Sequence, residues 1–282
     1  MDRRDDRGAQ SMIRLATCFA VLGSLFALIA ARPVPPACPT YENLNATLWM
    51  QTAVEYKAST METYHDAEGA LLRGIADHHW TAALEQTGDF ENLPPAVVLD
   101  LDETVLDNSP FEARLIASGN SWSEDAWQVW VKEEDAGLVP GALHFLEFAR
   151  DHHVAPIYIT NRACDPANDN DPTVQQLRKL KIPVATGADW MLCNDAGGGA
   201  DKTPRRTEVA RHYRIVLQFG DQLGDFLGIP KTSANLAGRE KLFDDHQPMW
   251  GERWFQLPNP TYGSWEGALG YTVEAKLPHL RK

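Results

Sequence analysis

The sequence predicts an α/β fold, a doubly wound parallel sheet with N-terminal helices and a small helical cap, on three observations. First, three uniformly apolar stretches are typical of strands buried on both faces, and they lie at residues 96–101, 155–159 and 215–219. Second, helical patterns alternate with these strands, at residues 141–150, 173–181 and 202–212. Third, 282 residues with 44% hydrophobic content suit one such domain with additions, or at most two domains.

Helices precede the predicted sheet and one more strand follows it. Over residues 43–84 apolar side chains recur at loosely helical spacing, which predicts two helices. Asn43 is placed to cap the first of them. Residues 254–257 predict a last strand, and the aromatic segment after it is predicted to be a loop.

The segment 108–139 interrupts the alternation of strands and helices. Ser123, followed by two acids, predicts a helix start within it. The segment is therefore interpreted as a small helical cap inserted directly after the first strand. Three tryptophans are assigned to packing in the core, namely Trp122, Trp130 and Trp265. The predicted division is a signal peptide at residues 1–37, an N-terminal helical segment at 38–94, and a domain at 95–282 with the cap insertion.

The N-terminus has the pattern of a signal peptide. An uncharged stretch over residues 15–31 follows Arg14 and gives way to a proline-rich segment, so the folded part is predicted to be exported. The alternatives are an uncleaved membrane anchor and a lipid anchor at Cys38, and these are the membrane contacts that we expect. Export permits Cys164 and Cys193 to form a disulfide, but their spacing does not demand one.

The formal net charge of −13 excludes one class of partner. Binding of a nucleic-acid polymer needs clustered Lys and Arg side chains, which an acidic chain of this kind does not supply. A small phosphate ester can still bind at a locally positive point. The oligomeric state stays open.

Polar residues follow each of the three apolar strands. Asp100 and Asp102 follow the first, Thr160 and Asn161 the second, and Asp221 the third, with Asp225 four residues later. Lys202 stands at the start of a predicted helix. Because parallel strands end at the same edge of a sheet, these side chains are predicted to converge on one crevice.

The chemistry of these side chains predicts a phosphoryl site. Carboxylates held close together repel each other unless a cation or a shared proton intervenes. Asp100, Asp102 and Asp221 offer hard oxygen ligands, which suit Mg²⁺. Donors from three other residues can hold a tetrahedral dianion beside the metal, and they are Thr160, Asn161 and Lys202.

Four ordered motifs resemble those of the haloacid dehalogenase superfamily of phosphatases, which implies a Rossmann-like sheet. They are DLDET from Asp100, TNR from Thr160, KxxRR from Lys202 and GDxxxDF from Gly220. LNATLWMQTAVEY, DNSPF, WxxW, VPGA and PNPTYGSWEG look more closely like the bacterial class C acid phosphatases. The resemblance covers nearly all of the chain after Pro39. It implies an enzyme of the cell envelope, located in the periplasm, at the outer membrane or secreted.

The resemblance also implies roles for individual residues. Asp100 would be the nucleophile that forms an aspartyl-phosphate, and Asp102 the general acid and base. Mg²⁺ would be held by the Asp100 side chain, the Asp102 main-chain carbonyl and Asp221, with Asp225 orienting that shell. Thr160, Asn161 and Lys202 would bind the phosphoryl oxygens. Trp127 and Tyr262 match positions at which the family stacks aromatic side chains on a nucleotide base, so 5′-nucleotides are the expected substrates.

Two alternatives belong to other classes. A non-catalytic phosphate- or nucleotide-binding protein, or a storage protein, on the same scaffold would not need Asp100, which is present. A dehalogenase also uses an aspartate as nucleophile, but it needs neither Asp102 nor a metal. The phosphomonoesterase interpretation therefore accounts for more of the sequence.

Overall fold

The computed structural model describes residues 42–184, 190–194 and 199–281. The predicted signal peptide at residues 1–37 and the candidate lipid site at Cys38 lie outside this range. Among the helices that the structure describes, none has the length and apolar character needed to cross a membrane.

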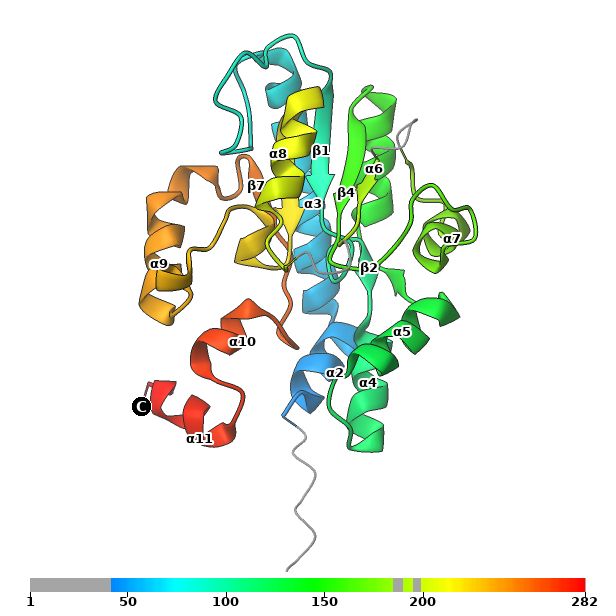
Figure 1. The fold of residues 1–282 in the computed structure, drawn as a ribbon, viewed down its shortest axis with the longest axis vertical. Coiled ribbons are helices and arrows are strands. Elements are labelled where there is room, and N and C mark those ends of the chain that lie inside the picture. The colour runs from blue at the N-terminus through cyan, green and yellow to red at the C-terminus, as the bar shows by residue number, and fades with distance from the viewer. Residues whose placement is uncertain (1–41, 185–189, 195–198, 282) are drawn as a thin grey trace, which may run out of the picture. The chain divides into compact units, whose positions relative to one another are not determined.

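The central sheet has five parallel strands in the spatial order β5-β4-β1-β6-β7 (Figure 1). The strands are β5 (Met191–Leu192), β4 (Ala155–Ile159), β1 (Pro95–Leu99), β6 (Arg214–Gly220) and β7 (Trp254–Gln256). After β1 the chain fills one side of the sheet with β4 and β5, and then crosses to β6 and β7 on the other side. The predicted α/β fold with a parallel sheet is therefore confirmed. The edge strand β5 was not predicted, because two residues carry no readable pattern.

Alternate residues of β1 face the two layers of the core. Val97 and Leu99 belong to one hydrophobic cluster, and Ala96 and Val98 belong to the other. The first cluster includes residues of helices α3 (Val54–Ala76) and α6 (Ala142–Asp151), and the second includes Val209 of α8 (Thr203–His212). Helices therefore cover both faces of the sheet, which explains why its strands are apolar throughout.

Two helices precede the sheet, as the sequence predicts: α2 (Leu44–Thr52) and α3. Asn43 occupies the N-cap position of α2, as predicted, but its side chain makes no capping hydrogen bond in the described structure. Asn43 Nδ2 instead donates a hydrogen bond to Glu112 Oε2 at 3.3 Å, and Glu112 lies in α4 (Ser109–Ser118). A contact with a distant segment thus replaces the local cap.

The segment after β1 holds two helices, α4 and α5 (Glu124–Glu133), between the short antiparallel strands β2 (Leu106–Asp107) and β3 (Gly137–Leu138). The side chain of Ser123 accepts a hydrogen bond from Ala126 N at 3.2 Å, so the predicted helix start is confirmed. Trp130 is buried, as expected for a core residue. The assignment of Trp122 and Trp265 to the core is wrong, since their exposed fractions are 57% and 36%.

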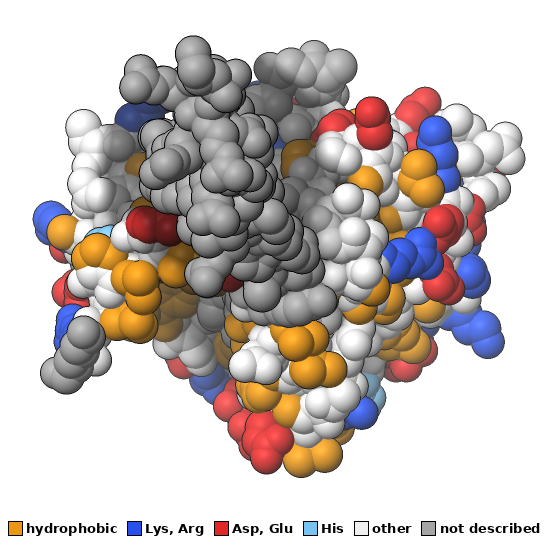
Figure 2. Space-filling view, turned by 90° about the horizontal axis from the view of Figure 1, so that it is seen from below, with side chains coloured by type: hydrophobic (Ala, Val, Ile, Leu, Met, Phe, Trp, Pro, Cys, Tyr) orange, Lys and Arg blue, Asp and Glu red, His pale blue; other side chains and the backbone are white. Residues whose placement is uncertain are grey.

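The remaining elements are mostly short. Helix α7 (Pro172–Lys179) follows β4, and Asp171 caps it by accepting hydrogen bonds from Thr173 N and Val174 N. The C-terminal part contains η1 (Leu223–Asp225), η2 (Lys231–Ser233), α9 (Leu236–Asp245), η3 (Gln247–Met249), α10 (Ser264–Leu269), α11 (Val273–Lys276) and η4 (Leu277–His279). Residues 264–269 were predicted as loop but form α10. Seen from below, exposed hydrophobic side chains lie in patches among charged ones (Figure 2).

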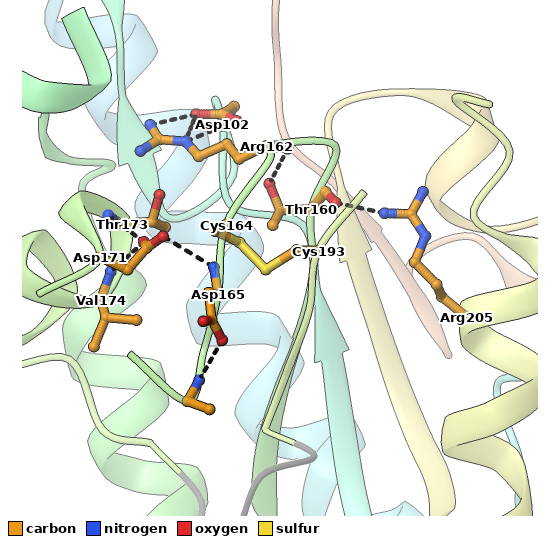
Figure 3. Close-up of a disulfide and its surroundings, with 11 residues drawn as sticks. Asp102, Thr160, Arg162, Cys164, Asp165, Asp171, Thr173, Val174, Cys193 and Arg205 are labelled. Atoms are coloured by element: carbon orange, nitrogen blue, oxygen red, sulfur yellow. Dashed lines mark hydrogen bonds and ion pairs between the residues drawn. A yellow bond between two sulfur atoms is a disulfide. The ribbon is translucent and has the colours of Figure 1, made fainter. Parts of the chain in front are cut away.

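Cys164 and Cys193 form a disulfide with a Cα–Cα distance of 5.5 Å, which resolves the question that the sequence left open. The bond joins the segment that follows β4 to the segment that follows β5 (Figure 3). Asn194 N also donates to Arg162 O at 3.0 Å, so the two segments are linked by backbone as well. The disulfide therefore fixes the segment that contains Thr160, Asn161 and Arg162.

Removal of this disulfide is expected to reduce stability. The bond closes a loop of 29 residues. Loop-closure entropy for such a length corresponds to roughly 3 to 4 kcal/mol. Urea unfolding of the Cys164→Ser/Cys193→Ser double variant should therefore show a lower free energy of unfolding than the wild type. Reduction of the wild type with a dithiol should give a similar loss, and an unchanged denaturation midpoint in both experiments would contradict the prediction.

Candidate active site

Three carboxylates meet where β1 and β6 end. Asp100 directly follows β1, and its N–H donates to Phe219 O at 3.1 Å, which holds it beside β6. Asp221 directly follows β6, and Asp225 ends η1. One carboxylate oxygen from each of Asp100, Asp221 and Asp225 lies within 4.8 Å of the others. These three acids, which the sequence predicted to converge, thus lie close together in the structure.

Gly220 allows this close approach. A Cβ at this position would lie 2.3 Å from Asp225 Cβ and 2.5 Å from Asp225 Oδ2, so no larger residue fits without moving Asp225. Asp225 Oδ2 accepts a hydrogen bond from Gln222 N at 2.9 Å, which fixes the turn after β6. The glycine is therefore required by the packing of the site.

Lys202 is the cation that pairs with two of these acids. Its Nζ lies 2.6 Å from Asp100 Oδ1 and 2.7 Å from Asp225 Oδ1. The residue is 4% exposed and directly precedes α8. Lys202, a predicted phosphate ligand, thus lies beside two of the acids. Its ammonium neutralises one of three neighbouring negative charges.

The electrostatics of the site favour an added positive charge. Burial is the largest effect on Asp100 and raises its pKa to about 7, with Lys202 opposing the shift and Asp225 adding to it. Burial likewise raises the pKa of Asp221 well above its ordinary value, and Asp225 and Asp100 add to this. Burial alone would lower the pKa of Lys202, but Asp100 and Asp225 outweigh it and raise that pKa.

One carboxylate oxygen of Asp221 could bind a cation. Its Oδ2 accepts a hydrogen bond from Asn259 Nδ2 at 2.8 Å, whereas the buried Oδ1 has no hydrogen-bond partner in the described structure. A buried carboxylate oxygen without a partner is costly unless an ion or water satisfies it. Hard oxygen donors and an excess of negative charge fit a divalent cation such as Mg²⁺. Sequence reasoning missed Asn259, which lies 38 residues from Asp221.

The segment after β4 places two predicted phosphate ligands. Thr160 is fully buried, and its hydroxyl accepts a hydrogen bond from Arg162 N at 3.1 Å, which leaves the hydroxyl proton for another acceptor. The amide oxygen of Asn161 accepts a hydrogen bond from Arg205 Nη2 at 2.7 Å. Arg205 also donates to Thr160 O, so it ties the segment to α8 (Figure 3). The role of Arg205 was not predicted.

Asp102 is held by two side chains that the sequence did not identify. Arg162 Nη2 and Nε donate to Asp102 Oδ1 at 2.7 and 3.0 Å, and Nε also lies 3.2 Å from Oδ2 (Figure 3). Asn108 Nδ2 donates to the same Oδ1 at 2.9 Å. The Asp102 side chain is therefore engaged with Arg162 and Asn108, and it does not belong to the cluster of three carboxylates.

The two predicted stacking residues lie on different segments, and each contacts a residue that holds one of the acids. The ring of half-buried Trp127 in α5 is 5.3 Å from the guanidinium carbon of Arg162. Tyr262 is also half-buried, and its N–H donates to Asn259 Oδ1 at 3.4 Å. Both residues thus adjoin the groups that hold Asp102 and Asp221.

Comparisons with known proteins agree with this geometry. A sequence profile described as HAD superfamily, subfamily IIIB (Acid phosphatase) matches residues 28–265. The class C acid phosphatase from Bacillus anthracis, solved with tungstate bound, is 32% identical, with a TM-score of 0.72 over 86% of this chain and 97% of that one. A second structure of that enzyme gives a TM-score of 0.71 at 32% identity, over 86% of this chain and 98% of that one.

The profile covers most of the chain, and the structural match extends over nearly the whole of a solved enzyme. The predicted membership of the haloacid dehalogenase superfamily is thereby confirmed, and the interpretation as a non-catalytic binding protein is set aside. The chain belongs to subfamily IIIB of the HAD superfamily, the acid phosphatases, and is a phosphomonoesterase.

Proposed function

We propose that this acid phosphatase is Mg²⁺-dependent, prefers 5′-nucleotides and works through an aspartyl-phosphate on Asp100. The observation that carries the proposal is the meeting of Asp100, Asp221 and Asp225 within 4.8 Å, beside the ammonium of Lys202. The tungstate in the Bacillus anthracis enzyme supports a site for a tetrahedral oxyanion in this fold.

The metal would be held by the side chains of Asp100 and Asp221 and the main-chain carbonyl of Asp102. Asp225 would orient this shell, since its two oxygens already contact Lys202 Nζ and Gln222 N. When bound, Mg²⁺ would offset the negative charge of the carboxylates and of the phosphoryl group. Thr160, Asn161 and Lys202 would bind the phosphoryl oxygens through their hydroxyl, amide and ammonium protons.

Catalysis would proceed in two displacements at phosphorus. In the first, a carboxylate oxygen of Asp100 forms a bond to phosphorus while the ester P–O bond breaks, and Asp102 gives its proton to the departing alcohol oxygen. In the second, Asp102 takes a proton from water as the water oxygen attacks phosphorus. The bond between Asp100 and phosphorus then breaks, which releases phosphate and restores both carboxyl groups.

Export is the proposed location, with the periplasm, the outer membrane and secretion as the alternatives. It is supported by the uncharged stretch at residues 15–31 after Arg14. The disulfide between Cys164 and Cys193 also fits an oxidising compartment. Fractionation of cells that express the full chain, with N-terminal sequencing of the product, tests the location and a cleavage after residue 37.

The activity is tested by a substrate panel. Purified protein should hydrolyse 5′-AMP, ribose 5-phosphate and p-nitrophenyl phosphate with added Mg²⁺, and 5′-AMP should have the highest kcat/KM. A chelator should remove activity on every member of the panel. Equal kcat/KM for 5′-AMP and ribose 5-phosphate would refute the nucleotide preference but leave the phosphatase chemistry intact.

Trp127→Ala is predicted to weaken the use of nucleotides selectively. This proposal treats residues 108–139 as the cap of a phosphatase domain at 95–282, with Trp127 and Tyr262 stacking on the base. Loss of one stacking contact corresponds to about 1 to 3 kcal/mol, so kcat/KM for 5′-AMP should fall roughly 5-fold or more. Ribose 5-phosphate has the same kind of leaving group and no base, so its kcat/KM should fall by less than that of 5′-AMP. An equal fall for both esters would contradict the stacking role.

A further inference from the structure

Arg162 has a role that the motif positions do not assign. It is 2% exposed, and its guanidinium makes its shortest side-chain contact with Asp102, at 2.7 Å. Breaking a buried pair of this kind leaves an unpaired charge and is strongly unfavourable. The planar guanidinium also fixes the carboxylate in orientation as well as in place. The pair therefore holds the Asp102 carboxylate in one orientation.

The hydrogen bonds to Asp102 are distributed unevenly between its two oxygens. Oδ1 accepts from Arg162 Nε, Arg162 Nη2 and Asn108 Nδ2. Among the residues that the structure describes, Oδ2 receives only the longer contact with Arg162 Nε, at 3.2 Å. An oxygen that already accepts three hydrogen bonds is poorly placed to exchange a proton with a substrate. Oδ2 is the oxygen that the arrangement leaves for that exchange.

The partners of Asp102 are themselves fixed by the surrounding structure. Asn108 Oδ1 accepts a hydrogen bond from Trp130 Nε1 at 2.8 Å and lies 3.3 Å from Arg162 Nη2. The ring of Trp127 lies against the guanidinium of Arg162 as a cation–π contact. The disulfide at Cys164 holds the chain two residues beyond Arg162. Asp102 is therefore held in place through contacts with the segment 108–139 and with the segment that follows β4.

We propose that Arg162, with Asn108, is a positioning residue that turns Oδ2 of Asp102 toward the ester oxygen of the substrate. The proposal rests on the general-acid role of Asp102 described above. Loss of Arg162 should therefore slow the reaction most for esters whose leaving group must be protonated. A primary alcohol cannot leave phosphorus as a bare alkoxide, whereas p-nitrophenolate can leave without a proton.

The test compares two esters in the Mg²⁺-loaded full-length enzyme. Arg162→Lys keeps the charge but loses the forked, planar donor set. Its kcat/KM, which reports the first displacement only, should fall roughly 10-fold to 100-fold on ribose 5-phosphate and less than about 3-fold on p-nitrophenyl phosphate, the range expected for impaired general-acid catalysis. Asn108→Ala should give the same selectivity and serves as a second variant if the first does not fold.

Two further variants distinguish the positioning role of Arg162 from an effect on phosphate binding and from the general-acid role of Asp102. Arg205→Gln alters the phosphate-binding segment and should lower kcat/KM for both esters to the same degree. Asp102→Asn should show the strongest dependence on the leaving group. If Asp102→Asn is selective and Arg162→Lys lowers both esters equally, the positioning role is wrong and the proposed mechanism stands. If Asp102→Asn itself is not selective, the general-acid role of Asp102 fails instead, and the positioning role fails with it.

Discussion

Asp100→Asn is expected to abolish turnover of p-nitrophenyl phosphate in Mg²⁺ buffer, with a loss of at least about 10³-fold in kcat, as for removal of other nucleophiles. The amide is a poor nucleophile, so the bond to phosphorus does not form. The side chain keeps its size, and Lys202 keeps its partner Asp225 at 2.7 Å. Removal of one buried carboxylate also relieves repulsion from Asp221 and Asp225. The variant should therefore be folded and at least as stable as the wild type.

Asp66→Asn provides the matched control. Asp66 is an exposed residue of α3, outside the site, and the same substitution there should leave kcat within about 2-fold, as surface changes usually do. Rapid quenching of the wild type should also trap phosphate on the protein, and Asp100→Asn should trap none. Activity near the wild-type level in Asp100→Asn would remove the proposed nucleophile.

Removal of Mg²⁺ is the second change with a large expected effect. The cation would contribute several kcal/mol of charge stabilisation in the transition state. Chelation should therefore lower kcat by roughly 10³-fold or more, and added Mg²⁺ should restore it. The assay is a titration of chelator and then of Mg²⁺ at constant ionic strength, with p-nitrophenyl phosphate as substrate. Full activity after exhaustive chelation would contradict the metal requirement.

The same cation should stabilise the fold, and more so at higher pH. Burial raises the pKa of Asp100 from 3.8 to about 7 in the metal-free protein. An acid with a raised folded pKa stabilises the protein below its unfolded pKa, and this stability is lost as the pH rises through the folded pKa. The free energy of unfolding of the metal-free protein should therefore fall between about pH 4 and pH 7. Over this range Asp100 loses its proton and becomes a buried negative charge beside other carboxylates.

Thermal unfolding with and without Mg²⁺ measures this linkage. A cation at 100 times its Kd adds about 2.7 kcal/mol, which corresponds to a rise in Tm of roughly 5 to 10 °C for a chain of this size. The rise should be clear near pH 7.5 and much smaller near pH 5, where protons compete for the carboxylates. NaCl at matched ionic strength is the control. An equal rise at both pH values would show that the ion does not replace protons at these acids.

The sequence predicted the parts of the fold that have strong local patterns. β4 begins and ends where it was expected, within an apolar run that lies between His153 and Thr160. The acids at the ends of β1 and β6 were also predicted to converge, since a parallel sheet brings its carboxyl ends together. The helix start at Ser123 follows from a local hydrogen bond.

Contacts between distant segments could not be predicted in this way. Arg162 and Asp102 are 60 residues apart, and nothing near either residue indicates the pair. Asn259 likewise holds Asp221 from 38 residues away. Asn43 has the residue type of a cap, but its side chain bonds to Glu112 in another helix. In each case tertiary packing decides the partner, and local propensity does not.

The separation of the site residues along the chain has a consequence for biosynthesis. Asp100 lies on the central strand, Asp221 follows a strand added after the crossover, and Asn259 comes after the last strand. A nascent polypeptide that has emerged only as far as residue 220 carries Asp100 and Lys202 but lacks Asp221, Asp225 and Asn259. Under the proposed function, a nascent chain would therefore be inert toward phosphate esters until residue 259 has been made and can reach Asp221.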